Sequence, residues 1–159
     1  MNGTLQRLRA EVRSDRSTFE SRLRELDALN LEDASPAPGD VARAAIAPHA
    51  AYCAVEALLA RVLRTVDGSI PDGPEWPREL LLAAGLTIPD IRPPLLSPAV
   101  VTDLQRLLGF RHFFRHAYAV ELDPTQLHAT REVARRVAAP LSADLDGLDA
   151  FLERLAAKT

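Results

Sequence analysis

The chain has 159 residues, 47% of them hydrophobic and 26% charged, a balance typical of one soluble globular domain with its own core. Its formal net charge of −3 argues against a protein that coats nucleic acid through a broad basic surface, so any such contact must be local. The sequence has no bilayer-spanning apolar run and no secretory signal at its start, and Cys53 has no disulfide partner. We therefore expect a single domain over residues 1–159, located in the cytoplasm and without a membrane partner.

Helical periodicity organises the first half of the chain. Apolar residues recur at threes and fours from Leu5 to about Leu29, which predicts a long amphipathic helix with a solvated charged face or, less readily, a partner-binding one. After a loop rich in proline, Asp40 is the expected N-cap of a second helix that runs to about Asp67. Pro48 lies inside this segment, so either the helix is kinked or its main body begins there.

The second half is also helical. Trp76 should pack a short helix onto the bundle, and residues 87–96, with three prolines, should be extended. A further helix should start at about Pro98 and end near Tyr118, and a last one should run from Pro124 to about Ala157, bent or split by Pro140. N-cap residues precede first-turn prolines at two starts, Ser97-Pro98 and Asp123-Pro124. No strand is indicated, so the fold class is all-α, an up-and-down bundle of about four to five helices.

A local basic stretch occupies the end of the helix that begins at Pro98. On a helical wheel with Arg111 at zero, Arg115 lies at about 40°, His112 at about 100° and His116 at about 140°. The phenylalanines among them fall on the opposite arc, which predicts a buried aromatic face and a cationic one. The cationic arc is either a solvated face that complements the helix dipole or a phosphate-handling site. In such a site imidazoles transfer protons near neutral pH and guanidiniums stabilise charge on phosphate oxygens.

Glu56 is an anomaly because its surroundings in the second helix are apolar nearly all round. It is either buried and paired with an arginine of the basic stretch, exposed at an edge, or catalytic. Cys53 reads as a small core residue and His49 as a residue on the helix surface. His112 and His116 are four apart and could bind a metal from one helix face, but no acidic third ligand is near in sequence. We expect neither a metal nor a cofactor.

Arg111, His116 and Tyr118, read as Arg, any four residues, His, any residue, Tyr, match the signature of the HEPN superfamily and in particular of the HepT-like ribonuclease toxins. The resemblance to a HepT-like subgroup covers about residues 40–155 and leaves only the N-terminal helix, residues 1–30, outside its clearest part. It is also carried by the order of Tyr52 and Glu56, Trp76-Pro77-Arg78-Glu79-Leu80-Leu81, the stretch from Phe110 to Tyr118, and Glu121-Leu122-Asp123.

The resemblance implies an all-α bundle that dimerises, so that the motif helices of two subunits face each other across a cleft. Arg111 and His116 would form a composite, metal-independent site that cleaves RNA by attack of the ribose 2′-hydroxyl on the adjacent phosphate. His116 would be the general acid or base, and Arg111 would stabilise the phosphorane charge. The implied partner is a nucleotidyltransferase antitoxin of a type VII-like toxin–antitoxin pair, which would silence the site by adenylylating Tyr118.

One position departs from the family pattern. The residue after the motif arginine is usually a small polar one, and here it is His112. His112 and Arg115 are supporting candidates, the first for orienting the phosphate or carrying a second proton, the second for binding a flanking phosphate. Two other functions stay open: a non-catalytic HEPN module that binds nucleotide, RNA or the transferase, and a helical interaction protein in which the motif only packs and caps. By spacing alone, Tyr118 would be an aromatic residue that closes the core.

Overall fold

The computed structural model describes residues 2–29, 31, 37–116 and 123–158, and for Asn2 and residues 112–116 it describes the backbone only. Within these ranges there is no strand, and a single isolated bridge joins Ile88 and Arg92. The predicted all-α class is therefore confirmed. The helices are α1 (Asn2–Asp27), α2 (Pro38–Val66), α3 (Trp76–Ala84), α4 (Pro98–His116) and α5 (Pro124–Ala157).

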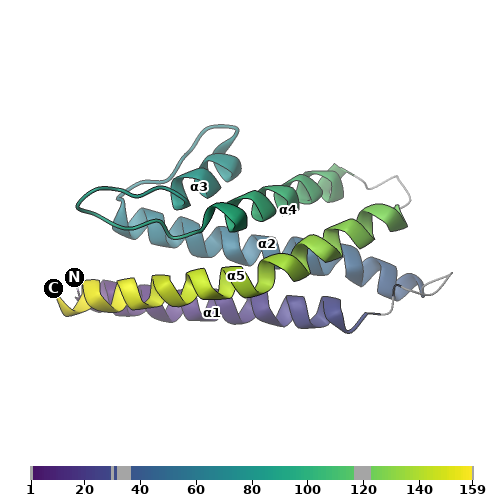
Figure 1. Cartoon of the computed structure of the whole chain (residues 1–159), viewed down its shortest axis with the longest axis horizontal. Helices are drawn as coiled ribbons and strands as arrows, with labels where there is room; N and C mark the ends of the chain where they lie inside the picture. Colours follow the sequence, from purple (N-terminus) through teal and green to yellow (C-terminus); the bar gives the residue numbers. More distant parts are fainter. Residues whose placement is uncertain (1, 30, 32–36, 117–122, 159) are drawn as a thin grey trace.

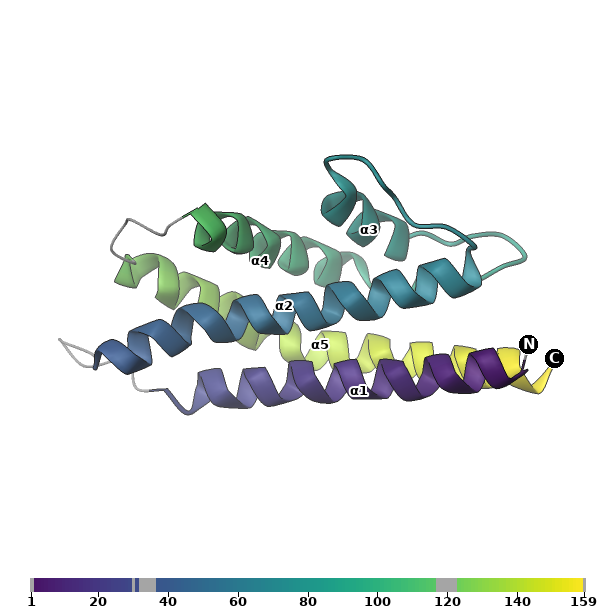
Figure 2. The same ribbon diagram turned by 180° about the vertical axis from the view of Figure 1, so that it is seen from behind.

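The four long helices run alternately up and down, and the two termini lie at the same end of the bundle (Figures 1 and 2). α1 packs against α2 and α5, whereas α4 packs against α2, α3 and α5. The short helix α3 lies on the outside of α2 and α4 (Figure 2). This arrangement places the basic end of α4 beside the middle of α2, away from the two termini.

Prolines set the beginnings of three long helices but do not interrupt them. α4 and α5 start at Pro98 and Pro124 as predicted, because a first-turn proline lacks an N–H that the helix would leave unsatisfied. The predicted N-cap Asp123 is confirmed, since its side chain accepts a hydrogen bond of 3.0 Å from the backbone N–H of Thr125. Pro140 lies inside α5, which continues as one helix and is not split.

The predicted start of α2 is wrong. Ala37 is the N-cap, Pro38 occupies the first turn, and Asp40 lies within that turn, where its carboxylate still complements the helix dipole. Pro48 is buried inside a helix that is already established on its N-terminal side. The alternative in which the main body begins at Pro48 is therefore also wrong.

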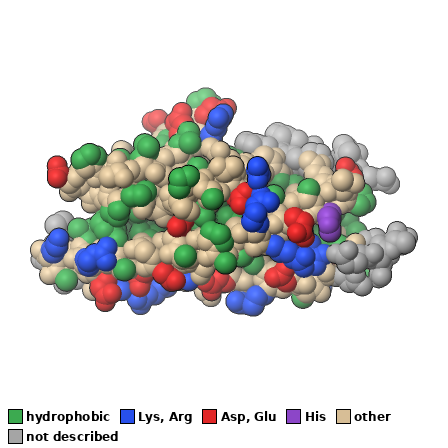
Figure 3. All heavy atoms as spheres, in the orientation of Figure 1, with side chains coloured by type: hydrophobic (Ala, Val, Ile, Leu, Met, Phe, Trp, Pro, Cys, Tyr) green, Lys and Arg blue, Asp and Glu red, His purple; other side chains and the backbone are tan. Residues whose placement is uncertain are grey.

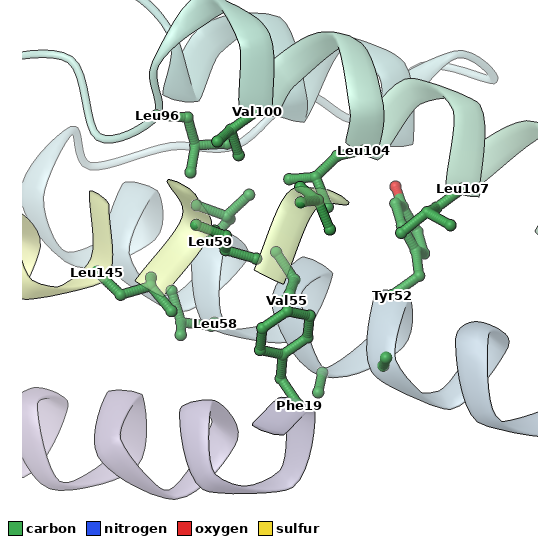
Figure 4. Close-up of a cluster of buried hydrophobic side chains, with 14 of the residues drawn as sticks. Phe19, Tyr52, Val55, Leu58, Leu59, Leu96, Val100, Leu104, Leu107 and Leu145 are labelled. Atoms are coloured by element: carbon green, nitrogen blue, oxygen red, sulfur yellow. The ribbon is translucent and has the colours of Figure 1, made fainter. Parts of the chain in front are cut away.

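α2 is the central element of the core. Its buried residues pack with Phe19 of α1, with Val100, Leu104 and Leu107 of α4 and with Leu145 of α5 in one connected cluster (Figure 4). This helix is long and apolar enough to cross a membrane, but 61% of its most apolar stretch is buried inside the bundle. Its apolar surface is thus used for packing. Trp76 is partly buried against the same cluster, as predicted.

Arg92 anchors the long connection between α3 and α4. Its guanidinium makes a two-bonded contact with the carboxylate of Asp67, at 2.7 and 2.8 Å, and donates to the backbone carbonyls of Ala83, Leu86 and Pro93 at 2.9 to 3.3 Å. The side chain is completely buried. All five N–H donors of this arginine are used, so it joins the end of α2 to the loop that leads into α4.

Candidate functional site

The motif arginine of α4 lies against α2. The Nη1 of Arg111 donates a hydrogen bond of 2.8 Å to Oε2 of Glu56, and the two side chains are only 14% and 10% exposed. Of the three interpretations of Glu56, pairing with an arginine of the basic stretch is confirmed and exposure at an edge is wrong. Because both charges are largely withdrawn from water, each depends on the other for compensation.

The aromatic ring of Tyr52 lies against the guanidinium of this ion pair. The guanidinium carbon of Arg111 lies 5.7 Å from the centre of the Tyr52 ring, within the range of a cation–π contact. The ring is fully buried, and its hydroxyl has no hydrogen-bond partner of acceptable geometry among the described residues. Burial, and secondarily the nearby Glu56 carboxylate, raises the pKa of Tyr52 far above its ordinary range, so its hydroxyl stays protonated.

The solvated-face interpretation of the basic arc is wrong for Arg111. The preceding turns of α4 place Leu104 at about 20° and Val100 at about 340° on the wheel that has Arg111 at zero. Leu104 and Val100 are both buried in the core. Arg111 therefore lies in line with the packed side of α4, and the wheel of the basic stretch alone did not include the residues that define that side.

The hydrogen bonding of Arg111 is incomplete within the described part of the protein. Of its five N–H donors, only one, on Nη1, has a hydrogen-bond acceptor there, and Nε is buried without one. The guanidinium is thus held in position by Glu56 and Tyr52 while donors remain for a further acceptor. An anion with several oxygens, such as a phosphate, suits that need.

The other predicted site residues are described only in part. The backbone of His112, Arg115 and His116 belongs to α4, and their side chains lie outside the described residues. Tyr118 lies outside the described residues altogether. The structure therefore brings Arg111 together with α2 but does not test the roles of the other four residues. Phe110, which belongs to the predicted aromatic face, is described and is buried in a small cluster with Ala45 and Leu127.

Two further polar residues of α2 lie on the side of the helix that carries Tyr52 and Glu56. The Sγ of Cys53 is 3.8 Å from Nε2 of His49, and both residues are partly buried. His49 is thus less exposed than a position on the helix surface would suggest. Spacings of three, four and seven residues place His49, Tyr52, Cys53 and Glu56 on one arc of α2. This spacing can be seen in the sequence.

A metal site is not formed by the described side chains. Among them, no three His, Cys, Asp or Glu residues gather in a way that could hold a metal ion. The side chains of His112 and His116 lie outside the described residues, so the expected absence of a metal stays a prediction.

The alternating bundle, with Arg111 and His116 separated by four residues at the end of α4, defines an all-α module of the HEPN type. The chain belongs to the HepT-like family, because the sequence model of the family described as HepT-like protein matches residues 44–154, well over half of the chain. The resemblance expected over about residues 40–155 is thereby confirmed. In general this family consists of toxin modules related to ribonucleases. No curated protein and no solved structure matches the chain.

Proposed function

We propose that this protein is the toxin of a type VII-like toxin–antitoxin pair and acts in the cytoplasm as a metal-independent endoribonuclease. The observation that supports this most is the state of Arg111. It is the motif arginine of a HepT-like chain, it is held by Glu56 and Tyr52, and it keeps donors that no described residue uses. An arginine held in this way can bind a phosphate without a further loss of side-chain conformational entropy.

The proposed reaction is an internal attack within RNA. His116 takes the proton of a ribose 2′-hydroxyl, whose oxygen then bonds to the adjacent phosphorus. The bond from phosphorus to the 5′-oxygen breaks, and that oxygen receives a proton from protonated His116 acting as the general acid, which leaves a 2′,3′-cyclic phosphate and a free 5′-hydroxyl. Arg111 donates hydrogen bonds to the phosphorane oxygens, whose negative charge grows in the transition state. His112 and Arg115 orient the phosphate and bind a flanking one.

Assembly and silencing complete the proposal. The single domain over residues 1–159 forms a homodimer whose two motif helices share one cleft. A nucleotidyltransferase antitoxin adds adenylate to Tyr118, which places a bulky anion beside Arg111 and His116. The added group both obstructs the cleft and cancels its positive field.

The activity is tested by expressing the full chain, Arg111→Ala, His116→Ala and Arg13→Ala without an antitoxin. Arg13 is a suitable control because it is also an arginine in an ion pair but is 62% exposed, on α1. Growth arrest and RNA degradation should persist with Arg13→Ala and disappear with the other two variants. Equal toxicity in all four, or cleavage that requires a divalent metal, would contradict the proposal. RNA binding without cleavage would instead support the non-catalytic module.

The regulatory part has its own test. Co-expression with the cognate transferase should add the mass of one or more adenylate groups to the peptide that contains Tyr118. Tyr118→Phe should remain unmodified and should stay toxic in the presence of the transferase. An unmodified wild-type peptide with an active transferase would refute this part and leave the nuclease assignment intact.

A further inference from the structure

A second group of arginines lies between α4 and α5, apart from Arg111. Asp103 of α4 accepts two hydrogen bonds from Arg136 of α5, at 2.6 and 2.9 Å, and one of 3.0 Å from Arg106. The carboxylate side chain is 10% exposed, whereas Arg106 and Arg136 are 57% and 52% exposed. A nearly buried carboxylate thus holds two guanidiniums at the surface.

Within this cluster two guanidiniums share one carboxylate through hydrogen bonds. The hydrogen bonds from Arg136 keep the pKa of Asp103 below its usual value, so its negative charge faces two positive ones, while Glu132, one helical turn before Arg136, adds a further negative charge near Arg136. The seam between α1 and α5 is different, because there the arginines are matched by at least as many carboxylates. Along the lower edge of Figure 3, where α1 lies, red and blue side chains are interleaved. The arginines of the seam are Arg9, Arg13 and Arg16, and its carboxylates are Glu20, Asp146, Asp149 and Glu153.

Arg106 and Arg136 keep donors that Asp103 does not use. Asp103 accepts from Nε and Nη2 of Arg136 and from Nη1 of Arg106, and no described residue accepts a hydrogen bond from Nη1 of Arg136 or from Nε and Nη2 of Arg106. The two arginines line a surface hollow of about 320 Å³. Its remaining wall is small and largely apolar, formed by Ala99, Val100, Thr102, Asp103 and Pro140. The residues that line the hollow therefore offer guanidinium donors held by Asp103, which is the one carboxylate among them.

The cluster and the catalytic motif lie along one helix. Arg106 precedes His116 by ten residues, which corresponds to about 15 Å along α4 and about 80° around it. Between them Gly109 is exposed, and a methyl group added there would meet no described atom within 4 Å. The surface of α4 from the cluster to the motif is thus open at this position, so that a polynucleotide strand has room to lie on it.

We propose that Arg106 and Arg136 form a phosphate-binding pair that holds the RNA backbone beside the cleavage site. The inference rests on the proposed ribonuclease function and adds a substrate-binding element to it. Forked guanidinium donors match phosphate oxygens, and their fixed orientation lowers the entropic cost of binding. Arg106 and Arg136 bind rather than react, so their loss affects binding and its salt dependence, not the chemistry at Arg111.

The test uses the full chain and a single-stranded 2′-O-methyl RNA, which lacks the attacking hydroxyl and is bound without being cut. Binding is measured across a series of salt concentrations for the wild type, Arg106→Gln/Arg136→Gln and Arg106→Gln alone. The matched control is Arg13→Gln/Arg135→Gln, which removes the same charge from two arginines that carboxylates of other helices neutralise. Arg106→Gln alone breaks a contact only within α4, so it leaves the α4–α5 connection intact if the double variant fails to fold.

The double variant should bind severalfold more weakly at low salt, and its plot of log affinity against log salt should be less steep by roughly 1.4, or about 0.7 per lost phosphate contact. Arg106→Gln alone should lose about 0.7 of slope, and the control should keep the wild-type slope. Unchanged slopes in both site variants, no RNA binding by the wild type, or weakened binding only of the transferase would overturn the inference. Cleavage of ordinary RNA is assayed separately and tests the proposed ribonuclease function. Failure of that function can therefore be distinguished from failure of the phosphate-binding role of Arg106 and Arg136.

Discussion

Arg92 and Arg111 are both largely buried arginines that face a carboxylate, but their remaining donors have different fates. Arg92 uses all five of its N–H groups within the protein, two on Asp67 and three on backbone carbonyls. Arg111 uses one on Glu56, and no described residue accepts from the others. A guanidinium whose donors are exhausted can only hold the fold, whereas one with donors in reserve can also bind an anion. The two side chains thus separate a structural role from a proposed chemical one.

The largest effect on stability is expected for Arg92→Ala. The substitution leaves the Asp67 carboxylate and three carbonyls without their donor, which should lower the free energy of unfolding by about 3–5 kcal/mol. Chemical denaturation of the purified protein measures this loss. A change below about 1 kcal/mol would show that Arg92 does not hold the loop before α4, and the comparison with Arg111 would then lose its structural half.

Arg111→Lys should produce the opposite pattern. Lysine keeps a positive charge for Glu56 but lacks the forked donors, so RNA cleavage should fall by about 10² to 10³-fold while the free energy of unfolding changes by less than about 1 kcal/mol. Arg92→Lys is the matched control and should lower stability with little change in cleavage per folded molecule. Both are followed by single-turnover cleavage and denaturant unfolding. Similar losses of stability and activity in the two variants would contradict the assignment of a structural role to Arg92 and a chemical role to Arg111.

Glu56→Gln tests what holds Arg111 in place. The amide preserves the size of the side chain and one acceptor oxygen, but it leaves the arginine charge uncompensated in a site that is 14% exposed. We expect a stability loss of about 1–2 kcal/mol and a decrease in cleavage of about tenfold, equivalent to about 1.4 kcal/mol. The decrease should be smaller than for Arg111→Lys. A variant more active than wild type would show that Glu56 restrains Arg111 instead of positioning it.

The smallest effect at neutral pH is expected for Tyr52→Phe. Its hydroxyl has no partner of acceptable geometry among the described residues, so removal should change the free energy of unfolding by less than about 0.5 kcal/mol. In the unfolded chain Tyr52 loses its proton near its ordinary pKa of 10.0, while the folded protein retains it because the pKa there is raised. Stability from this group is therefore full below pH 10 and is lost as the pH rises beyond it.

Unfolding measurements from pH 7 to 11 on the wild type and Tyr52→Phe isolate that contribution. The phenylalanine variant should lose less stability above pH 10 than the wild type, because it has no proton to release in the unfolded state. Parallel pH dependence in the two proteins would mean that the Tyr52 hydroxyl is not as withdrawn from water as its surroundings indicate.

Most of the helical scaffold was predictable because its signals are local. Apolar residues at helical spacing marked α1 and α5, and the first-turn prolines Pro98 and Pro124 marked two starts to the residue. The start of α2 was misplaced because a proline followed by an acidic residue offers two competing N-terminal signals, and Pro38 prevailed over Asp40 as the marker. Continuity through Pro48 and Pro140 depends on packing along the whole helix, which a local proline rule does not include.

The sequence by itself determined an all-α HepT-like chain, a basic motif at one helix end, and Glu56 as a carboxylate in need of a partner. Only the tertiary structure decided that this partner is Arg111, that Tyr52 lies beneath it, and that the charged face of α1 is in part an ion-paired seam with α5. The physical reason is that periodicity reports which side of one helix is apolar, whereas an ion pair needs two helices at a defined register. Which guanidiniums retain free donors is settled only where helices meet.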